Sequence, residues 1–363
     1  MLGGEFAIEP ASLFECPSAT GLPLPPDSPA TGRGALLLMA RALLGLGCRA
    51  VLLPAFVCES VVAPFVQQGF DIHFFPVGLD LQIDLDAVAS QLGGAAMVAL
   101  LFVNYFGFAP GSVARRRLRE IARRHVVIED CTHGSLLESP RPVVGSIGQL
   151  VFSSLRKYLP LPDGCIVLNR GDIPLPEAGP AVRQPAALRS VAALLKGTFL
   201  ENGGKDPDME QSYVKLFASA EEVIAKQKGS ASCSPFSRQL VGRLNLRLSL
   251  VRRRANFRYL CEAFARDRRL RRLAEPLIGR LPAGVSPFSF PILVKDGRRD
   301  HLQAALRKLR LFCAVHWRLP GGINARKFSE TQELSSRILS LPVDQRYGPA
   351  QMAEIIRRLS QAA

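Results

Sequence analysis

Short apolar runs alternate with helical patterns between about residues 30 and 170 of this 363-residue chain. Runs that are apolar throughout are typical of strands buried on both faces of a sheet. Strands separated by helices pair in parallel, because each helix returns the chain to the edge where the previous strand began. The pattern therefore predicts an α/β fold with a mostly parallel central sheet and helices on both faces. The predicted strands are residues 50–54, 72–77, 97–104, 126–130, 150–154 and 165–169, and the predicted helices are residues 34–46, 58–68, 85–92 and 112–124.

The remainder of the chain is less regular. Residues 171–235 contain many prolines and glycines and are predicted to be irregular, with one helical stretch near residues 187–200. Residues 238–265 have the pattern of one long amphipathic helix. The elements predicted beyond it are strands at residues 288–294 and 311–317 and helices at residues 300–309 and 349–359.

The change of pattern near residue 235 predicts two domains, which the length of the chain allows. The large domain spans residues 1–235 and includes an N-terminal segment at residues 1–30. The smaller α+β domain spans residues 236–363.

The formal net charge is +15. Much of the excess lies in arginine-rich stretches in which leucine, isoleucine and alanine recur at helical spacing, as in the solvated faces of amphipathic helices. Helix-turn-helix, zinc-finger and stacking-aromatic motifs do not accompany these arginines. We therefore expect no nucleic-acid partner and interpret the charge as attraction for an anionic substrate.

Membrane insertion and secretion are not expected. The longest apolar candidate, residues 35–47, is interrupted by Arg41 and is shorter than the roughly 18 to 20 residues that a membrane span needs. Glu5 and Glu9 stand where a secretory leader has basic residues. The eight cysteines form no Cys-x-x-Cys pair, so we expect reduced core thiols in a cytoplasmic protein, with neither a disulfide framework nor a metal site.

Lys157 stands where a predicted strand ends and a proline-rich loop begins, and Asp130 ends the preceding apolar run. A lysine in a loop is usually a solvated surface residue. A lysine and an aspartate at the ends of neighbouring strands are, however, the pair that pyridoxal phosphate requires. The lysine carries the cofactor's aldehyde, and the carboxylate keeps the pyridine nitrogen protonated.

Two segments resemble the DegT/DnrJ/EryC1/StrS family of sugar aminotransferases. They are Ile128-Glu-Asp-Cys-Thr-His133 and Ser153-Ser-Leu-Arg-Lys-Tyr-Leu-Pro-Leu-Pro-Asp-Gly164, and the tail Leu339-Ser-Leu-Pro-Val-Asp-Gln-Arg-Tyr347 is similar to the family's closing motif. The resemblance implies the aspartate-aminotransferase fold (fold type I) and pyridoxal 5'-phosphate as cofactor. It also implies transfer of an amino group from glutamate or glutamine to a nucleotide-linked keto sugar, in polysaccharide or secondary-metabolite biosynthesis. The resemblance further implies a homodimer with active sites at the subunit interface.

The resemblance also assigns cofactor contacts. Thr31-Gly-Arg-Gly-Ala-Leu36 opens the first helix where the family binds phosphate, so Gly32, Arg33 and Gly34 are predicted phosphate contacts, although the same turn is also an ordinary helix cap. Ser153 and Ser154 are either phosphate contacts or ordinary strand-end residues. His133 is predicted to lie near the phenolic oxygen of the cofactor and to take part in catalysis with Lys157 and Asp130.

The chain departs from the family pattern at two places. After Pro54, where the family has an aromatic residue that stacks on the pyridine ring, this chain has Glu59, so either Phe56 reaches the ring or another residue does. The family's Gly-x-Asn-x-Arg segment has no clear counterpart. The predicted substrate contacts, each of which has packing or solvent exposure as its alternative role, are Tyr105, Arg156, Tyr158, His316 and Trp317.

These residues predict a pyridoxal-phosphate-dependent aminotransferase with an amino-acid donor and an anionic keto acceptor. Two alternatives remain open from the sequence. One keeps the cofactor and changes the outcome to elimination, dehydration or carbon–carbon bond chemistry on an amino acid. The other is a regulatory protein that retains the fold without catalysis.

Overall fold

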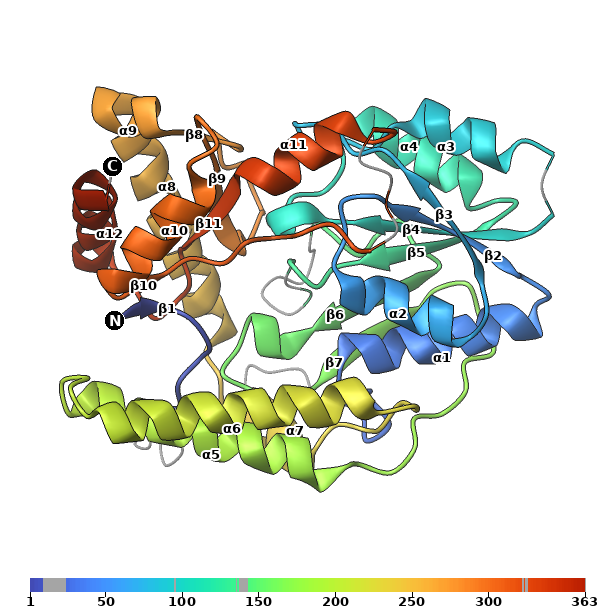
Figure 1. The fold of residues 1–363 in the computed structure, drawn as a ribbon. Coiled ribbons are helices and arrows are strands. Elements are labelled where there is room, and N and C mark those ends of the chain that lie inside the picture. Colours follow the sequence, from blue (N-terminus) through green and yellow to red (C-terminus); the bar gives the residue numbers. More distant parts are fainter. Residues whose placement is uncertain are drawn as a thin grey trace.

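The computed structural model describes residues 1–8, 24–94, 96–134, 136, 143–321, 323 and 326–362. Figure 1 shows a six-stranded sheet, a three-stranded sheet beside it and a pair of long helices below both. Part of the predicted N-terminal segment, residues 9–23, lies outside the described residues.

The large sheet has the strand order β3-β2-β4-β5-β6-β7. Its first five strands run parallel, and β7 pairs antiparallel with β6. Every residue of β4, β5 and β6 is buried, as expected for strands covered on both faces. The predicted fold class is confirmed. The strands are β2 (Ala50–Pro54), β3 (Asp71–Phe75), β4 (Val98–Val103), β5 (Val126–Asp130), β6 (Leu150–Ser154) and β7 (Cys165–Asn169).

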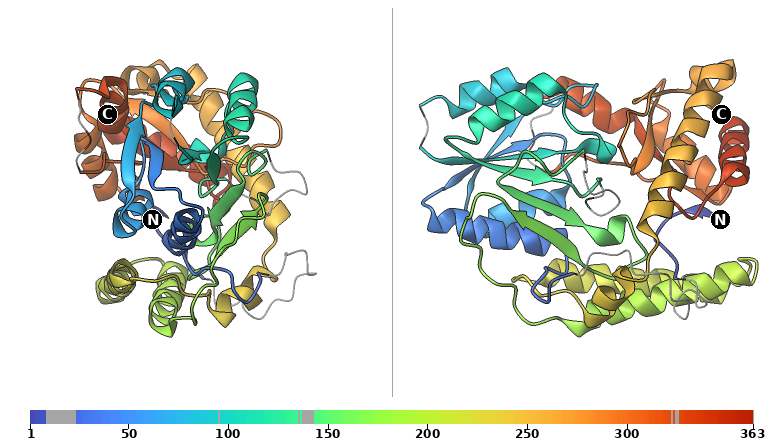
Figure 2. Two further views of the ribbon diagram at one scale, coloured as in Figure 1. Left: turned by 90° about the vertical axis from the view of Figure 1, so that its right-hand side faces the viewer. Right: turned by 180° about the vertical axis from the view of Figure 1, so that it is seen from behind.

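Helices cover both faces of this sheet (Figures 1 and 2). One face carries α1 and α2, which pack on each other, and the other carries α3 and α4. Thr31 caps the start of α1, where its Oγ accepts a hydrogen bond from the Gly34 N–H at 3.0 Å. The helices are α1 (Gly32–Gly45), α2 (Glu59–Gln67), α3 (Leu85–Leu92) and α4 (Ser112–Ile121).

The prediction of an irregular region at residues 171–235 is wrong over much of its length. A helical hairpin occupies it, formed by α5 (Arg183–Glu201) and α6 (Pro207–Lys226). The breaker-rich Asn202–Asp206 stretch is only the turn between them. Asp206 caps α6 by accepting from the N–H groups of Asp208 and Met209, and the helix buries Tyr213, Phe217, Ala220 and Ile224 at helical spacing.

The single helix predicted at residues 238–265 is two helices, α7 (Pro235–Val241) and α8 (Leu246–Arg266). The break falls at Gly242–Asn245. Asn245 accepts from the Leu248 N–H at 2.9 Å and so starts a new helix instead of continuing the first. Helical periodicity alone does not show such a break, because the apolar spacing continues across it.

The C-terminal part folds around an antiparallel sheet of order β11-β9-β8. Its core includes Phe257, Phe264, Phe290 and Leu341, each at most 1% exposed. Strand β11 comes from the tail motif, and the strand predicted at 311–317 is reduced to β10. The elements are β8 (Ala274–Pro276), β9 (Ser289–Val294), β10 (Leu311–Phe312), β11 (Ile338–Pro342), α9 (Arg268–Leu273), α10 (Arg299–Lys308), α11 (Ser329–Arg337) and α12 (Pro349–Ala362).

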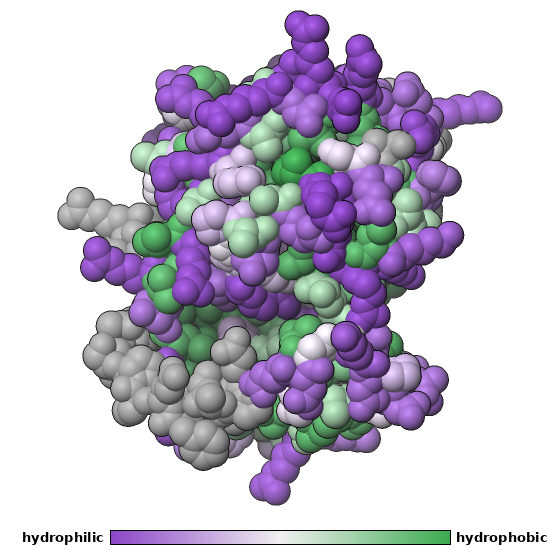
Figure 3. All heavy atoms as spheres, turned by 90° about the vertical axis from the view of Figure 1, so that its left-hand side faces the viewer, coloured by the Kyte–Doolittle hydropathy of each residue, from purple (hydrophilic) through white to green (hydrophobic). Residues whose placement is uncertain are grey.

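Strongly hydrophilic side chains project from this C-terminal part (Figure 3). Ten arginines and two acidic residues lie between Leu246 and Leu273. In α8 and α9 the side chains of Phe264, Leu270 and Leu273 are buried, whereas Arg266 is 81% exposed. The arginine-rich stretches therefore lie mostly on the solvated faces of amphipathic helices, as their periodicity predicts, with the exception of Arg253, which is 1% exposed.

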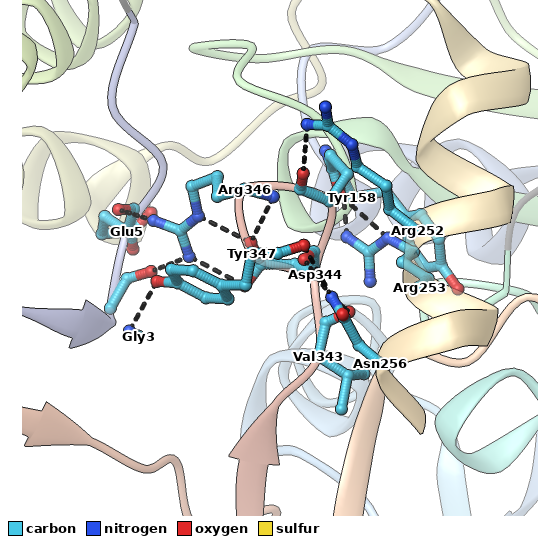
Figure 4. Close-up of polar contacts among 12 residues, drawn as sticks. Gly3, Glu5, Tyr158, Arg252, Arg253, Asn256, Val343, Asp344, Arg346 and Tyr347 are labelled. Carbon is cyan, nitrogen blue, oxygen red and sulfur yellow. Dashed lines mark hydrogen bonds and ion pairs between the residues drawn. The ribbon is translucent and has the colours of Figure 1, made fainter. Parts of the chain in front are cut away.

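The first residues of the chain pack against the last elements. Strand β1 (Leu2–Gly3) pairs in parallel with β10, and Leu2 belongs to the C-terminal core. The Gly3 N–H donates to the Tyr347 hydroxyl at 2.7 Å, and the Arg346 guanidinium donates to the carbonyl oxygens of Gly4 and Glu5 (Figure 4). The division of the chain at residue 235 stays a prediction, but its first residues are held by the C-terminal part.

Gly3→Ala should destabilise the protein more than Gly47→Ala. Both glycines have a left-handed φ, +83° and +81°, but a Cβ on Gly3 would approach the Phe312 carbonyl oxygen to 2.1 Å, whereas Gly47 has open space. We expect Gly47→Ala to cost about 1 kcal/mol and Gly3→Ala about 2–4 kcal/mol of the free energy of unfolding. Chemical denaturation measures both. Equal losses in the free energy of unfolding would contradict this expectation, because they would show that β1 accommodates a Cβ on Gly3 without extra cost.

Candidate active site

The parallel pairing of β5 and β6 brings Asp130 and Lys157 to one edge of the large sheet. Asp130 is the last residue of β5 and pairs in register with Phe152 of β6. Strand β6 ends at Ser154, and the tight turn Leu155–Lys157 follows at once. The carboxyl ends of parallel strands are where α/β sheets bind ligands.

Asp130 and Lys157 line one cavity of about 250 Å³. The start of α1 and the end of α6 both contribute to its wall. Its lining residues are Thr31, Gly32, Arg33, Leu36, Val57, Cys58, Ser60, Val61, Val103, Asp130, Thr132, His133, Phe152, Ser154, Arg156, Lys157, Glu221, Ile224, Ala225 and Trp317.

The Asp130 carboxyl is 4% exposed. Its Oδ1 accepts a hydrogen bond from the Thr132 N–H at 2.7 Å. Burial raises the pKa of Asp130 above its ordinary value, and hydrogen bonds from Thr132 and the charge of Lys157 oppose this shift only in part. A carboxylate in this position would gain from a further cationic partner in the cavity.

His133 is 1% exposed and lies between two aromatic rings. Its ring stacks on Phe288, with 4.2 Å between centroids and 9° between planes, and on Trp317, with 5.0 Å and 20°. Burial, with the charges of Lys157 and His316, lowers the pKa of His133 well below its ordinary value, so the ring is neutral. Among the described residues neither ring nitrogen has a hydrogen-bond partner. Buried nitrogens without partners are expected where a ligand supplies the missing bonds.

The start of α1 forms the end of the cavity where the sequence predicts phosphate binding. Gly32 and Arg33 line it, and Arg33 also donates from Nη1 to the Ala225 carbonyl oxygen at 3.3 Å. Gly34 lies behind them, where a Cβ would approach Ser230 Oγ to 3.0 Å. Ser154 lines the cavity. Ser153 does not, because its hydroxyl donates to the carbonyl oxygens of Cys131 and Gly134.

Four other predicted residues line neither this cavity nor the second one described below. Phe56 is fully buried and packs on Tyr105 and Trp317, and the Tyr105 hydroxyl donates to the Phe56 carbonyl oxygen at 2.6 Å. Glu59 is exposed at the start of α2. Tyr158 is 3% exposed, and its hydroxyl donates to the Ser286 carbonyl oxygen at 2.5 Å. The residues on either side of Glu59 that line the cavity are Val57, Cys58, Ser60 and Val61.

A second cavity of about 540 Å³ adjoins the first and shares Arg156, Lys157 and Glu221 with it. His316 lies in its wall, with Nδ1 2.8 Å from Ser340 Oγ. Burial and the charge of Lys157 lower the pKa of His316 to about 3. The remaining lining residues are Gly3, Gly4, Glu5, Phe6, Arg253, Phe288, Ser289, Phe312, Ala314, Ser340, Pro342, Asp344 and Arg346.

Sequence reasoning missed the contributions of α6 and of the first residues of the chain. Glu221 lies on α6 and Glu5 in the N-terminal segment, far from Lys157 in sequence. The Asp206-Pro207 cap and the apolar spacing that follows could have revealed α6. A sequence pattern that points to Glu5 is absent.

Within the described residues, metal-ligating side chains form no group of three or more, and no helix is long and apolar enough to cross a membrane. The seven cysteines in that part of the chain are free thiols.

No protein-family model matches this chain, and no curated protein matches it in sequence. Solved structures do. A DegT/DnrJ/EryC1/StrS aminotransferase from Brucella abortus matches with 19% identity and a TM-score of 0.59, over 92% of this chain and 84% of that one. The sugar aminotransferase CalS13 from Micromonospora echinospora matches with 16% identity and a TM-score of 0.59, over 92% and 86%. A Streptococcus pneumoniae protein in its PLP form matches with 13% identity and a TM-score of 0.66, over 97% and 94%.

This chain has the aminotransferase fold. At these identities the likeness concerns the fold, and it is a likeness to the family that the sequence motifs resemble.

Asp130→Asn should stabilise the ligand-free protein at neutral pH. Folding raises the pKa of this carboxyl, so its burial costs no stability at a pH below its unfolded pKa, where it is protonated in both states. The loss in the free energy of unfolding grows as the pH rises through the folded pKa, because the buried carboxyl then ionises. Asparagine can still accept from the Thr132 N–H. We therefore expect a higher melting temperature for the variant at pH 7 and a smaller gain near pH 4, measured by thermal unfolding.

The matched control is the neighbouring carboxylate, Glu129→Gln. Glu129 is also buried, but it accepts hydrogen bonds from the N–H groups of Gly145, Ile147 and Gly148 at 2.6–2.9 Å. Losing an acceptor there should cost about 1–3 kcal/mol. Destabilisation by both substitutions would contradict the assignment of Asp130 as a strained, function-bearing carboxyl.

Proposed function

We propose that this chain is a pyridoxal-phosphate-dependent aminotransferase. One observation carries the proposal: Lys157 and Asp130 line the same 250 Å³ cavity, whose wall also contains the start of α1. The aminotransferase fold and the family motifs around both residues support it.

The residues present fit the cofactor. The buried Asp130 carboxyl would pair with the protonated pyridine nitrogen, which relieves the cost of its burial. The Lys157 amine would bond to the aldehyde carbon, and the backbone at the start of α1, with Arg33 and Ser154, would hold the phosphate. His133 is neutral and has ring nitrogens without partners, so it can hydrogen-bond to the cofactor's ring oxygen. When bound, the cofactor supplies an electron-withdrawing ring.

The protein's own groups then perform three tasks. With the cofactor bound, Lys157 Nζ would take the proton from the substrate carbon and later release it, acting as base and then as acid. Asp130 would keep the cofactor's ring nitrogen protonated. The apolar side chains of Val103, Phe152 and Trp317 limit water in the cavity, which strengthens the interactions of the charged groups.

The proposed donor is glutamate or glutamine, and the proposed acceptor is an anionic keto compound, most specifically a nucleotide-linked keto sugar used for polysaccharides or secondary metabolites. The net charge of +15 and the cavity positions of Arg33 and Arg156 support an anionic substrate. Relatives in fold that are named sugar aminotransferases support the sugar. The family resemblance supports a homodimer.

Purified protein reconstituted with the cofactor should absorb visible light, and borohydride should fix the adduct on Lys157. Lys196 provides a demanding control, because it is 3% exposed and burial lowers its pKa to about 8. Lys157→Gln should abolish the band, whereas Lys196→Gln should retain it. Peptide mapping that places the adduct on Lys196, or the absence of any adduct, would reject the proposal.

Titration with L-glutamate should replace the visible band by that of the aminated cofactor, and an anionic keto acceptor should restore it. A panel of nucleotide-linked keto sugars and simple keto acids separates the acceptor classes by absorbance. Restoration by keto acids alone would reject the sugar and keep the aminotransferase. Loss of the donor's amino group as free ammonia would instead indicate a lyase.

A further inference from the structure

We infer that Arg156 anchors the anionic group of the substrate and that Glu221 is an internal placeholder which this group displaces. The inference rests on the proposed function, since it concerns substrate binding beside Lys157. Arg156 immediately precedes Lys157 and lines both cavities.

The ion pair between Arg156 and Glu221 has the geometry of a bound substrate anion. Arg156 Nη1 lies 2.6 Å from Glu221 Oε1, and Nη2 lies 3.3 Å from Oε2. A guanidinium binds a carboxylate or a phosphate in this same forked manner. The Arg156 Nε is buried and, among the described residues, has no hydrogen-bond partner. The guanidinium therefore has one further N–H that can donate to a ligand.

Arg253 and Arg346 also line the second cavity, and Arg156 differs from both in its hydrogen-bond partners. Arg253 donates to the backbone carbonyl oxygens of Tyr158, Pro287 and Phe288. Arg346 donates to those of Gly4 and Glu5 and to the Asp344 carboxylate, as Figure 4 shows for its N-terminal contacts. These partners are fixed parts of the fold. Arg156 is held instead by a side chain that is 45% exposed on α6, so its partner can be exchanged.

A second arginine makes the exchange possible without leaving a charge unpaired. Arg189, whose side chain is 3% exposed, donates from Nη1 to Glu221 Oε1 at 2.6 Å and from Nη2 to Glu5 Oε2 at 2.8 Å. The four side chains form the row Glu5–Arg189–Glu221–Arg156. When a substrate anion takes Arg156, Glu221 keeps Arg189, which remains held by Glu5. The usual penalty for breaking an ion pair is thereby reduced.

The second cavity offers the space that such a substrate needs. Its volume of about 540 Å³ lies within the range of small-molecule sites, roughly 300–1,000 Å³. Glu5 and Phe6 of the N-terminal segment form part of its wall, so Glu5, which pairs with Arg189, would also border a substrate in this cavity. An anion seated on Arg156 would place the rest of the substrate beside Lys157.

The test measures binding of glutarate and of inorganic phosphate by calorimetry, with the cofactor-loaded protein and with the cofactor-free protein. Glu221→Gln should tighten binding of both anions about 3- to 10-fold, because the competitor has lost its charge. Arg156→Gln should weaken binding by about 10-fold or more. In the double variant the gain from Glu221→Gln should disappear, because the two residues act through one interaction.

Glu222→Gln is the matched control, since it removes the same charge from the adjacent, exposed position of α6. It should leave anion affinity unchanged within about twofold. With an accepted anionic acceptor, Glu221→Gln should lower KM and leave kcat unchanged, which a merely structural role would not do. Melting temperatures verify folding, and Arg156→Lys, which keeps the charge without the fork, provides a second variant for the anchor.

Unchanged or weaker binding in Glu221→Gln would overturn the inference, as would equal effects of Glu221→Gln and Glu222→Gln. Failure of the proposed function would be seen separately, as the absence of a borohydride-stable adduct on Lys157. Anion binding that follows this pattern in a protein without the adduct would retain the Arg156 exchange and reject the aminotransferase.

Discussion

The pairing of β5 with β6 is the constraint on which the rest of the site depends. In-register parallel strands place Asp130 and the turn that contains Lys157 at one edge, and both strands are buried along their whole length. Glu129, one residue before the aspartate, binds three backbone N–H groups of the loop that leads into β6. The Glu129 carboxylate thus fixes the connection between the strands. The Asp130 carboxylate lines the cavity and accepts from a single backbone N–H, that of Thr132.

This contrast explains how the same strand end supplies both stability and chemistry. A buried carboxyl saturated by backbone donors stabilises the fold, whereas a buried carboxyl with few donors costs free energy until a cation arrives. His133 follows the same logic: its ring is packed between Phe288 and Trp317, yet its nitrogens have no partner among the described residues. Apolar packing holds these polar groups rigidly, and they can still form further hydrogen bonds. They can therefore bind a polar ligand without further rearrangement.

The sequence predicted the large sheet well because its strands are continuous apolar runs with clear boundaries. It placed Asp130 at the end of one strand and Lys157 just beyond the next. It predicted less where function depends on contacts distant in sequence. Phe56, Tyr105 and Tyr158 have residue types common in binding sites, but their burial and hydrogen bonds place them in the packing around the cavity. The sequence did not point to Glu221, because the glycines before α6 and the proline at its start favoured an irregular segment there. It did not point to Glu5, because no local pattern marks that residue.

The N-terminal segment shows why such contacts escape local patterns. Its Glu5 carbonyl accepts from Lys196 of α5 and from Arg346 of the C-terminal tail, and its side chain pairs with Arg189. Three parts of the chain therefore meet at one short segment, and none of these bonds lies within 180 residues in sequence. Because the segment also borders the second cavity, a ligand there contacts the residues that join α5 to the C-terminal part. A ligand bound there would be coupled to the packing of these elements through the same few charges, and the effect of each on the other would be equal.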